Sequence, residues 1–132
     1  MMATIFSKII SGEIPCYKVA ESEAFLAFLD IRPLAKGHTL VIPKKEVDYF
    51  YDLDDPDLAE LMVFAKRVAH AIRSVVPCIK IGTAVIGLEV PHAHVHLVPL
   101  NAVGELNFAR EPLHLEPAEM MAIATEINAH FQ

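Results

Sequence analysis

The chain has 132 residues, a formal net charge of −6, 54% hydrophobic residues and 21% charged residues. These values indicate one globular domain over residues 1–132 and argue against a nucleic-acid-binding protein, because phosphate contacts need clustered Lys and Arg. The sequence contains neither a basic amino-terminal segment followed by an apolar run nor an uncharged run long enough to span a bilayer, so we expect a cytoplasmic protein with no membrane partner.

The first predicted element is a short helix over residues 5–10, which ends at the Ser11-Gly12-Glu13 break. The strand candidates are short runs flanked by Gly, Pro or Asp. They cover residues 17–20, 24–30, 38–42, 79–86 and 92–98.

The longest predicted helix covers residues 55–76. Asp55 can cap it, Pro56 suits the first helical position and Pro77 ends it. Apolar residues form one stripe at spacings of three and four: Leu58, Leu61, Met62, Ala65, Val68, Ala69, Ile72 and Val75. A second helix over residues 117–131 has the same spacing. Strands grouped before and after one long helix predict an α+β domain with a mainly antiparallel sheet.

The segment PHAHVHLVP, residues 91–99, carries a histidine at every second position. On a strand, His92, His94 and His96 share one face, while the apolar residues between them share the other. A solvated strand whose polar face is imidazole would explain a single histidine better than it explains three.

Two chemical interpretations remain open for this strand. In a metal site, two neighbouring histidines whose Cα atoms lie about 6.6 Å apart could share an ion. All three span roughly 13 Å, so a mononuclear zinc site would need two of them plus His38 or Glu89. In metal-free catalysis, one neutral imidazole attacks phosphorus, a second protonates the leaving atom and a third orients the first.

The segment HAHVHLV, residues 92–98, satisfies the signature of the histidine triad (HIT) proteins, and the chain resembles that family of nucleotide hydrolases and transferases. Further similar segments are IFSKIISGEIPCYKV from Ile5, AFLAFLDIRPLAKGHTLVIPKK from Ala24, and GLEVP from Gly87. The resemblance covers most of residues 3–99, which form the predicted core of the domain, whereas residues 100–132 carry little family signal.

The resemblance implies a five-stranded antiparallel sheet with one long helix, a short amino-terminal helix and a carboxy-terminal helix. It also implies a homodimer with a continuous ten-stranded sheet. The implied activity is attack on the α-phosphorus of a nucleotide derivative through a nucleotidyl-histidine intermediate, without a metal or other cofactor. The nucleoside phosphoramidase-like branch is the closest match, with phosphoramidates or dinucleoside polyphosphates as substrates.

Catalytic roles follow from the resemblance by position. His94 is the implied nucleophile, and His96 would contact the phosphate and assist the leaving group. His92 would position His94 through its backbone. His38, in KGHTLVIP, matches a fourth histidine near the triad, and its alternative interpretation is a buried strand histidine satisfied by a hydrogen bond.

The implied substrate-binding residues surround the nucleoside. Asp30 matches the acid that binds the ribose hydroxyls. The apolar slot for the base is made of Phe6, Ile9, Phe28 and Ile31, although these residues could also be plain core.

The chain departs from the family at two phosphate-binding positions. Leu88 stands where relatives usually have Gln, and residues 81–83 lack the usual Asn. Thr83 and the backbone N–H groups of Glu89 and Val90 could partly replace these amides. The departures keep open an alternative from another class, a nucleotide-binding regulatory module with little turnover. A His-ligated metalloprotein is the less favoured third hypothesis.

Overall fold

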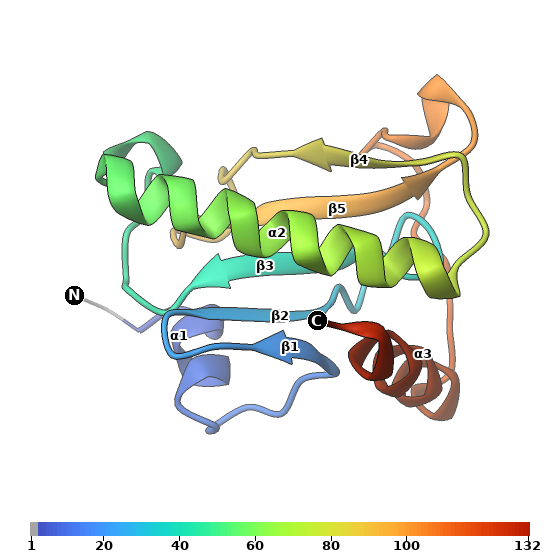
Figure 1. The fold of residues 1–132 in the computed structure, drawn as a ribbon, viewed down its shortest axis with the longest axis horizontal. Coiled ribbons are helices and arrows are strands. Elements are labelled where there is room, and N and C mark those ends of the chain that lie inside the picture. Colours follow the sequence, from blue (N-terminus) through green and yellow to red (C-terminus); the bar gives the residue numbers. More distant parts are fainter. Residues whose placement is uncertain (1–2) are drawn as a thin grey trace.

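The computed structural model describes residues 3–132, which form a five-stranded antiparallel sheet of order β1-β2-β3-β5-β4 with helices on both faces (Figure 1). The strands are β1 (Lys18–Glu21), β2 (Phe25–Leu29), β3 (Thr39–Pro43), β4 (Lys80–Ala84) and β5 (Val95–Leu100). This architecture confirms the predicted α+β class and the antiparallel sheet.

Every predicted strand overlaps an observed one, but the boundary before the triad strand is wrong. β5 begins at Val95 rather than at His92. The amide of Ala93 donates to the carbonyl of Val47, and the amide of His92 donates to the carbonyl of Val90 in a turn. His92 and His94 therefore precede the regular ladder, and their backbone is fixed by loop contacts.

Helix α2 (Asp55–Val75) lies across one face of the sheet. Its cap is Asp54, whose side chain accepts a hydrogen bond from the amide of Asp57, so the predicted cap at Asp55 is wrong by one residue. The buried stripe also differs at three positions, one of which is Ala71, buried but not predicted. Met62 is exposed, whereas Phe64 is buried because it packs against Phe25 from β2, 5.5 Å between ring centroids.

Helix α3 (Pro117–His130) packs beside α2 and against β1. The side-chain amide of Asn128 donates to the carbonyl of Val19 at 2.8 Å, which ties the helix to this edge of the sheet. The opposite edge is β4, which exposes Lys80 and Thr83. Within residues 3–132 no helix is both long and apolar enough to cross a membrane.

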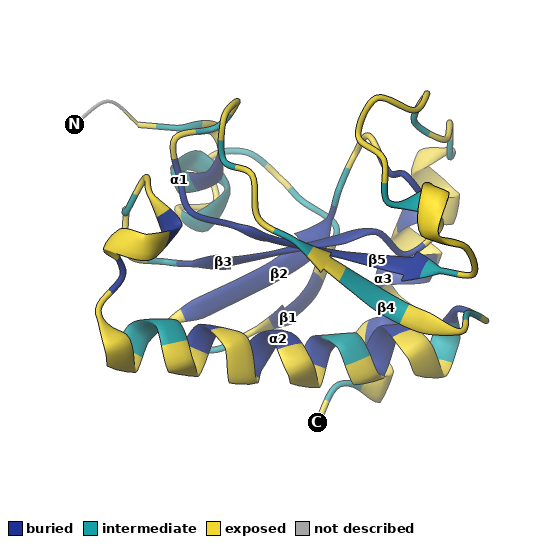
Figure 2. Ribbon diagram, turned by 90° about the horizontal axis from the view of Figure 1, so that it is seen from above, coloured by how far each residue is buried: buried dark blue, intermediate teal, exposed yellow. Residues whose placement is uncertain are grey.

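Helix α1 (Ile5–Ile10) covers the other face of the sheet, opposite α2 (Figure 2). A capping box between Thr4 and Ser7 starts this helix. Short 3₁₀ turns, η1 (Phe50–Asp52) and η2 (Val103–Glu105), lie in the connections. Side chains of β2 and β3 are buried on both faces, so the sheet separates two apolar clusters, a large one under α2 and a smaller one around Phe6 under α1.

Candidate active site

A cavity of about 480 Å³ opens on the face of the sheet that carries α1. Its walls come from α1, the end of β2, residues 86–90, the triad segment and the segment after β5. Of the residues predicted for the site, those that line the cavity are Phe6, Ile9, Phe28, Asp30, Ile31, Glu89, Val90, His94 and His96. His38 and His92 lie behind this lining, fully buried.

The four predicted histidines are all buried. The exposed fractions are 0% for His38, 1% for His92, 6% for His94 and 8% for His96. The predicted alternation holds, because Ala93, Val95 and Leu97 lie in the apolar cluster under α2. These exposures exclude the solvated-strand interpretation of the triad.

His94 is held in one tautomer by the backbone. Its Nδ1 lies 2.7 Å from the carbonyl oxygen of His92. A carbonyl only accepts, so Nδ1 carries the hydrogen in the neutral ring and Nε2 keeps its lone pair. Because His94 lines the cavity and its Nε2 has no hydrogen-bond partner within residues 3–132, that lone pair is available to a ligand.

His92 holds His94 in place through its backbone, and its own ring is fixed by a hydrogen bond. Its Nε2 donates to the carbonyl of Pro43 at 2.8 Å, which fixes the ring against the end of β3. The backbone carbonyl of His92 is the acceptor for His94. The ring of Phe6 meets the rings of His92 and His94 edge-on, at centroid distances of 5.9 and 5.0 Å.

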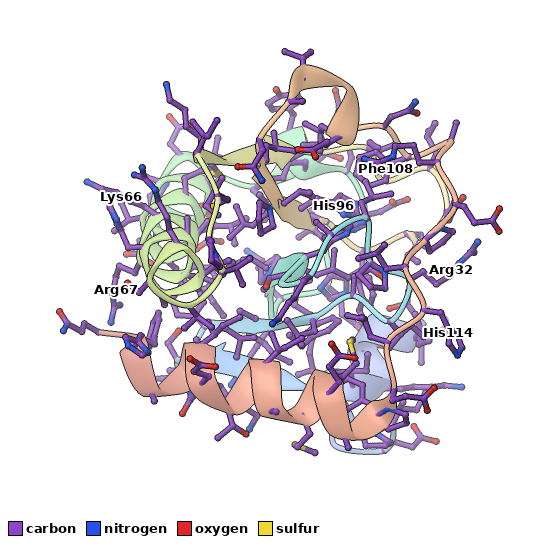
Figure 3. The ribbon with its side chains drawn as sticks, turned by 90° about the vertical axis from the view of Figure 1, so that its right-hand side faces the viewer. Arg32, Lys66, Arg67, His96, Phe108 and His114 are labelled. Carbon is purple, nitrogen blue, oxygen red and sulfur yellow. The ribbon has the colours of Figure 1, made fainter. Side chains whose placement is uncertain are left out.

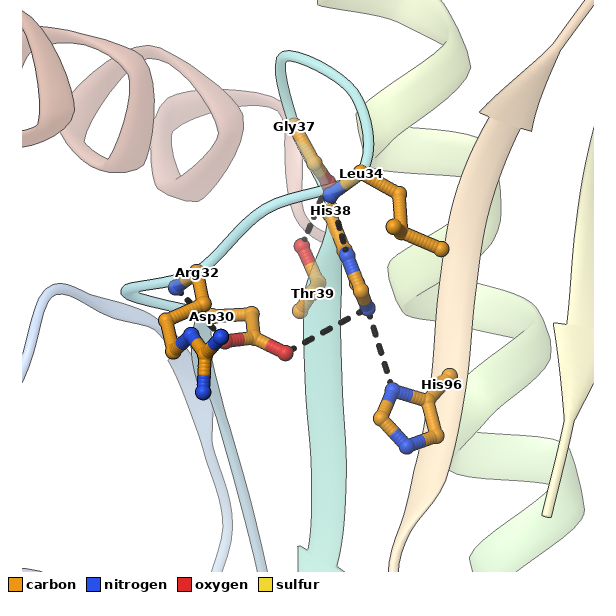
Figure 4. A network of polar contacts seen from close by, with 7 residues as sticks. All are labelled: Asp30, Arg32, Leu34, Gly37, His38, Thr39 and His96. Atoms are coloured by element: carbon orange, nitrogen blue, oxygen red, sulfur yellow. Dashed lines mark hydrogen bonds and ion pairs between the residues drawn. The ribbon is translucent and has the colours of Figure 1, made fainter. Parts of the chain in front are cut away.

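His38 and His96 form a directed chain of hydrogen bonds (Figure 4). The amide of Leu34 donates to Nδ1 of His38 at 2.9 Å, so the hydrogen of the neutral His38 ring must sit on Nε2. That Nε2 lies 3.0 Å from Nδ1 of His96, which therefore accepts. It follows that the neutral His96 ring carries its hydrogen on Nε2, and His96 lines the cavity.

Asp30 lies at the cavity mouth beside this chain. One carboxylate oxygen accepts from the amide of Arg32 at 2.8 Å, and the other lies 3.5 Å from Nε2 of His38. The amide of Asp30 donates to the carbonyl of His38, which joins the two residues across the β2–β3 connection.

Burial keeps the site imidazoles neutral. It lowers the pKa of His94 and of His38 below the usual 6.5. For His96, burial and the neighbouring His38 and His94 lower the pKa to about 3. Without a ligand, these rings carry no charge near pH 7.

The apolar slot predicted for a base is only partly a core feature. Phe6 and Phe28 are buried and pack edge to face, 5.6 Å between centroids. Ile9 is partly buried, but Ile31 is 72% exposed at the mouth of the cavity. The interpretation of Ile31 as core is therefore wrong.

The positions that depart from the family lie on both sides of Gly87. Leu88 lines the cavity yet is 89% exposed, after Gly87 with φ of +71°. Thr83 is exposed on β4 and does not line the cavity, so the suggestion that it replaces a phosphate-binding amide is wrong. Glu89 and Val90 do line it.

Phe108 and Arg110 line the cavity and were not predicted from the sequence. The Phe108 ring lies 4.6 Å from that of His96 and 6.1 Å from that of His38, between centroids. Figure 3 shows Phe108 and Arg32 on the side of the molecule opposite Lys66 and Arg67. No spacing or motif in the segment after β5 signals these contacts, because they depend on how that segment folds back over the sheet.

Among the described residues, Asp30, His38 and His96 are the cluster with metal-ligand geometry, with ligand atoms within 4.8 Å of one another. Glu89, one predicted outside ligand, is not part of it. The cluster thus contains one histidine of the triad, His96, whereas the metal hypothesis needed two.

Residues 11–103 match the HIT domain family. The adenosine 5'-monophosphoramidase hnt1 of Schizosaccharomyces pombe is 36% identical over 130 residues, which cover 97% of this chain and 98% of that protein.

Solved structures are similar over nearly the whole chain. A Hit-like protein involved in cell-cycle regulation from Bartonella henselae has a TM-score of 0.86 and 30% identity, covering 97% of this chain and 96% of that one. A zinc-bound histidine triad family protein from Mycobacterium smegmatis has a TM-score of 0.82 and 30% identity, covering 98% of this chain and 93% of that one.

Proposed function

Since the chain belongs to the HIT family of nucleotide hydrolases, we propose that it cleaves nucleotide derivatives at the α-phosphorus, without a metal, through a nucleotidyl intermediate on His94. The proposed substrates are purine nucleoside phosphoramidates or dinucleoside polyphosphates. The observation that carries this proposal is the His94 tautomer, which leaves the Nε2 lone pair at the cavity.

The first step forms a bond from Nε2 of His94 to the α-phosphorus and breaks the bond to the leaving group. The leaving atom takes the bonding electron pair, and a phosphoramidate bound with its nitrogen protonated releases ammonia. Nδ1–H of His94 stays hydrogen-bonded to the carbonyl of His92, which stabilises the positive charge of the nucleotidylated ring. Nε2–H of His96 donates a hydrogen bond to a phosphoryl oxygen or the leaving atom.

In the second step, water attacks the same phosphorus. The bond between phosphorus and Nε2 of His94 breaks and its electron pair returns to the ring. One proton of the water stays on the oxygen now bound to phosphorus, and the other leaves to solvent. The neutral His94 tautomer is thereby restored. Asp30 accepts hydrogen bonds from the ribose hydroxyls, and the slot formed by Phe6, Ile9, Phe28 and Ile31 receives the base.

The test is AMP release from adenosine 5'-phosphoramidate by protein treated with EDTA. We expect turnover in the wild type and in His70→Ala, an exposed histidine on α2, and no turnover in His94→Ala. Rapid quenching followed by mass spectrometry should find one nucleotidyl group on the peptide that contains His94. Full activity of His94→Ala would refute the assignment of the nucleophile.

A nucleotide-binding regulatory module is the second candidate, favoured by the exposed Leu88 at a phosphate-binding position. It would bind AMP tightly and turn over neither phosphoramidates, dinucleoside polyphosphates nor adenylyl sulfate. The same substrate panel separates it from the hydrolase.

A metal at the Asp30, His38 and His96 cluster conflicts with the hydrogen bonding of His38. Metal binding through Nε2 would move the ring hydrogen to Nδ1, where it would face the Leu34 amide. The zinc of the Mycobacterium smegmatis protein therefore does not transfer to this cluster. Stoichiometric zinc that survives dialysis and is needed for activity would contradict the metal-free proposal.

We further infer a homodimer formed through β4, with a continuous ten-stranded sheet. β4 is the edge strand that α3 leaves uncovered, and its residues are exposed or half-buried. Analytical ultracentrifugation at micromolar concentration should give a dimer, and a Thr83→Lys variant, which adds a charge to this exposed edge strand, should shift the mass toward a monomer.

A further inference from the structure

The segment from residue 101 to residue 113 forms a fixed wall of the cavity. At its start, Oε1 of Glu105 accepts the amides of Asn101 at 2.6 Å and Ala102 at 2.9 Å. At its end, the amide of Leu113 donates to the carbonyl of Pro33 at 2.8 Å. Both ends are thus attached to the domain, one beside β5 and the other at the β2–β3 connection.

The middle of this wall contacts the imidazoles of His96 and His38. The ring of Phe108 packs edge-on against His96, and Arg110 follows two residues later on the same wall. Nη1 of Arg110 donates to the carbonyl of Glu105 at 3.0 Å. This single bond orients the guanidinium and leaves most of its five N–H donors available to a ligand.

An anionic leaving group in the cavity needs a cation beside it. Among the described lining residues, Arg32 and Arg110 are the permanent cations, against Asp30 and Glu89 as acids. Burial lowers the pKa of His38, His94 and His96, so these three imidazoles are neutral. Leu88, where relatives usually have an amide, adds no polar side chain.

The hydrogen-bond chain also limits which leaving groups the site can serve. Nδ1 of His96 accepts from His38, so His96 holds a single hydrogen, on Nε2. Giving that hydrogen away completely would leave an imidazolate, which is strongly disfavoured in a buried site. An amine must therefore bind with its nitrogen already protonated, whereas a leaving group that departs as a stable anion requires only a hydrogen bond and a nearby cation.

We propose that Arg110 binds an anionic leaving group, so that this hydrolase prefers nucleotides whose α-phosphorus is joined to phosphate or sulfate over those joined to an amine. This proposal rests on the hydrolase function proposed above. Arg110 lies outside residues 11–103, the part that matches the family model, so this preference comes from the carboxy-terminal segment. The reaction it describes is the same displacement at phosphorus, with the electron pair of the broken P–O bond leaving on the phosphate or sulfate oxygen.

The first test measures binding and does not depend on turnover. In a His94→Ala background, calorimetry compares ADP, whose β-phosphate occupies the leaving-group position, with AMP. Adding Arg110→Ala should weaken ADP binding about tenfold and AMP binding less than about twofold, and Arg110→Lys should recover part of the loss. Arg73→Ala, an exposed arginine on α2, is the matched control and should change neither affinity.

Equal losses for ADP and AMP would overturn the proposal, because Arg110 would then bind the α-phosphate or only support the wall. Unchanged ADP binding would overturn it as well. Raising the salt concentration should reduce the wild-type preference for ADP and have little effect on the preference left in Arg110→Ala.

Turnover with two substrates that share the adenylyl group separates this proposal from the function on which it rests. Arg110→Ala should lower kcat/KM about tenfold for adenylyl sulfate and about twofold or less for adenosine phosphoramidate. If the wild type cleaves neither substrate, the hydrolase proposal fails while the binding result still decides the role of Arg110. If the wild type cleaves both and Arg110→Ala reduces both equally, the role of Arg110 fails and the hydrolase stands.

Discussion

Nε2 of His38 lies 3.0 Å from Nδ1 of His96, and the amide of Leu34 decides which of the two nitrogens carries the hydrogen between them. A backbone amide cannot lose its hydrogen, so it fixes His38 as an acceptor at Nδ1 and a donor at Nε2. The fixed tautomer of His38 in turn sets the tautomer of His96, which lines the cavity. His38 is thus a positioning residue, because it acts on a ligand through its neighbour.

We expect His38→Ala to lower kcat about tenfold or more with little change in KM, because His96 loses the partner that sets its tautomer. Removing His38 also removes one cause of the lowered pKa of His96, so that pKa should rise toward 6.5. Long-range ¹H–¹⁵N spectra report both the tautomer and the titration of His96.

His70→Ala is the matched control for this variant, since His70 is exposed on α2. A loss of activity in His38→Ala with the His96 tautomer and titration unchanged would show that His38 has only a structural role.

The stability of the protein should fall as the pH drops from about 6.5. The pKa of His96 is lowered to about 3 in the folded chain, while an unfolded histidine titrates near 6.5. Between these values the unfolded state binds more protons than the folded state, so acidification favours unfolding. Urea denaturation at pH 7.0, 6.0 and 5.0 should show this slope above the range where carboxylates titrate.

His96→Asn should have a shallower slope over the same pH range, because it removes one histidine with a lowered pKa. The variant can be less stable than the wild type at pH 7 without affecting this test, which compares slopes. Identical slopes would show that His96 does not contribute to the acid sensitivity.

Local patterns in the sequence were enough to predict the helices, the strands and the face that the triad occupies. Residues 92–97 alternate between histidine and apolar side chains, and alternation is a property of extended chain that does not depend on distant contacts. The long helix was also predicted from a local pattern, the spacing of its apolar residues by three and four. Asp54 and Asp55 both suit a cap, however, and only the observed backbone shows which side chain accepts the hydrogen bond from an amide.

The rest of the site depends on contacts between distant segments. Phe108 and Arg110 reach the cavity because Leu113 bonds to Pro33, and no local pattern encodes that pairing. The chain of hydrogen bonds from Leu34 through His38 to His96 likewise joins the β2–β3 connection to β5. The sequence indicated which histidines lie together beside the cavity, but their tautomers required the three-dimensional structure.

Asp30→Asn should weaken AMP binding about tenfold, since hydrogen bonds to a charged acceptor contribute about 1.5–3 kcal/mol. Binding of 2',3'-dideoxy-AMP should be nearly unchanged, because it lacks the hydroxyls that Asp30 is proposed to bind. Calorimetry with both nucleotides forms a double cycle between protein and ligand.

Asp48→Asn is the matched control, because it removes the same charge from an exposed position that does not line the cavity. If Asp30→Asn weakened the binding of both nucleotides equally, the carboxylate would act through its charge and not through hydrogen bonds to the ribose hydroxyls.

Gly37→Ala and Gly12→Ala form a pair that separates backbone strain from packing. Both glycines have positive φ, +90° and +84°, so in both variants the alanine must adopt a left-handed backbone conformation, which costs about 1–2 kcal/mol. A Cβ at Gly37 would also lie 2.8 Å from Cγ2 of Val76, whereas a Cβ at Gly12 meets nothing within 4 Å. We expect Gly37→Ala to cost about 1–3 kcal/mol more in the free energy of unfolding, measured with urea.

The loop that holds Gly37 leads directly into His38, so Gly37→Ala should also lower kcat, while Gly12→Ala should not. Equal losses of stability in the two variants would mean that the loop yields to the added methyl group.

Leu88→Gln should raise kcat/KM for adenosine phosphoramidate by roughly threefold to tenfold, because a side-chain amide would donate to the phosphoryl oxygens where an apolar group now stands. Leu88 is 89% exposed, so the free energy of unfolding should change by less than about 0.5 kcal/mol. Leu88→Ala, which removes the apolar side chain without adding a donor, serves as the control and should not increase the rate. If Leu88→Gln is slower than the wild type, the leucine itself contributes to binding, and the apolar side chain at this position is part of how this chain recognises its substrate.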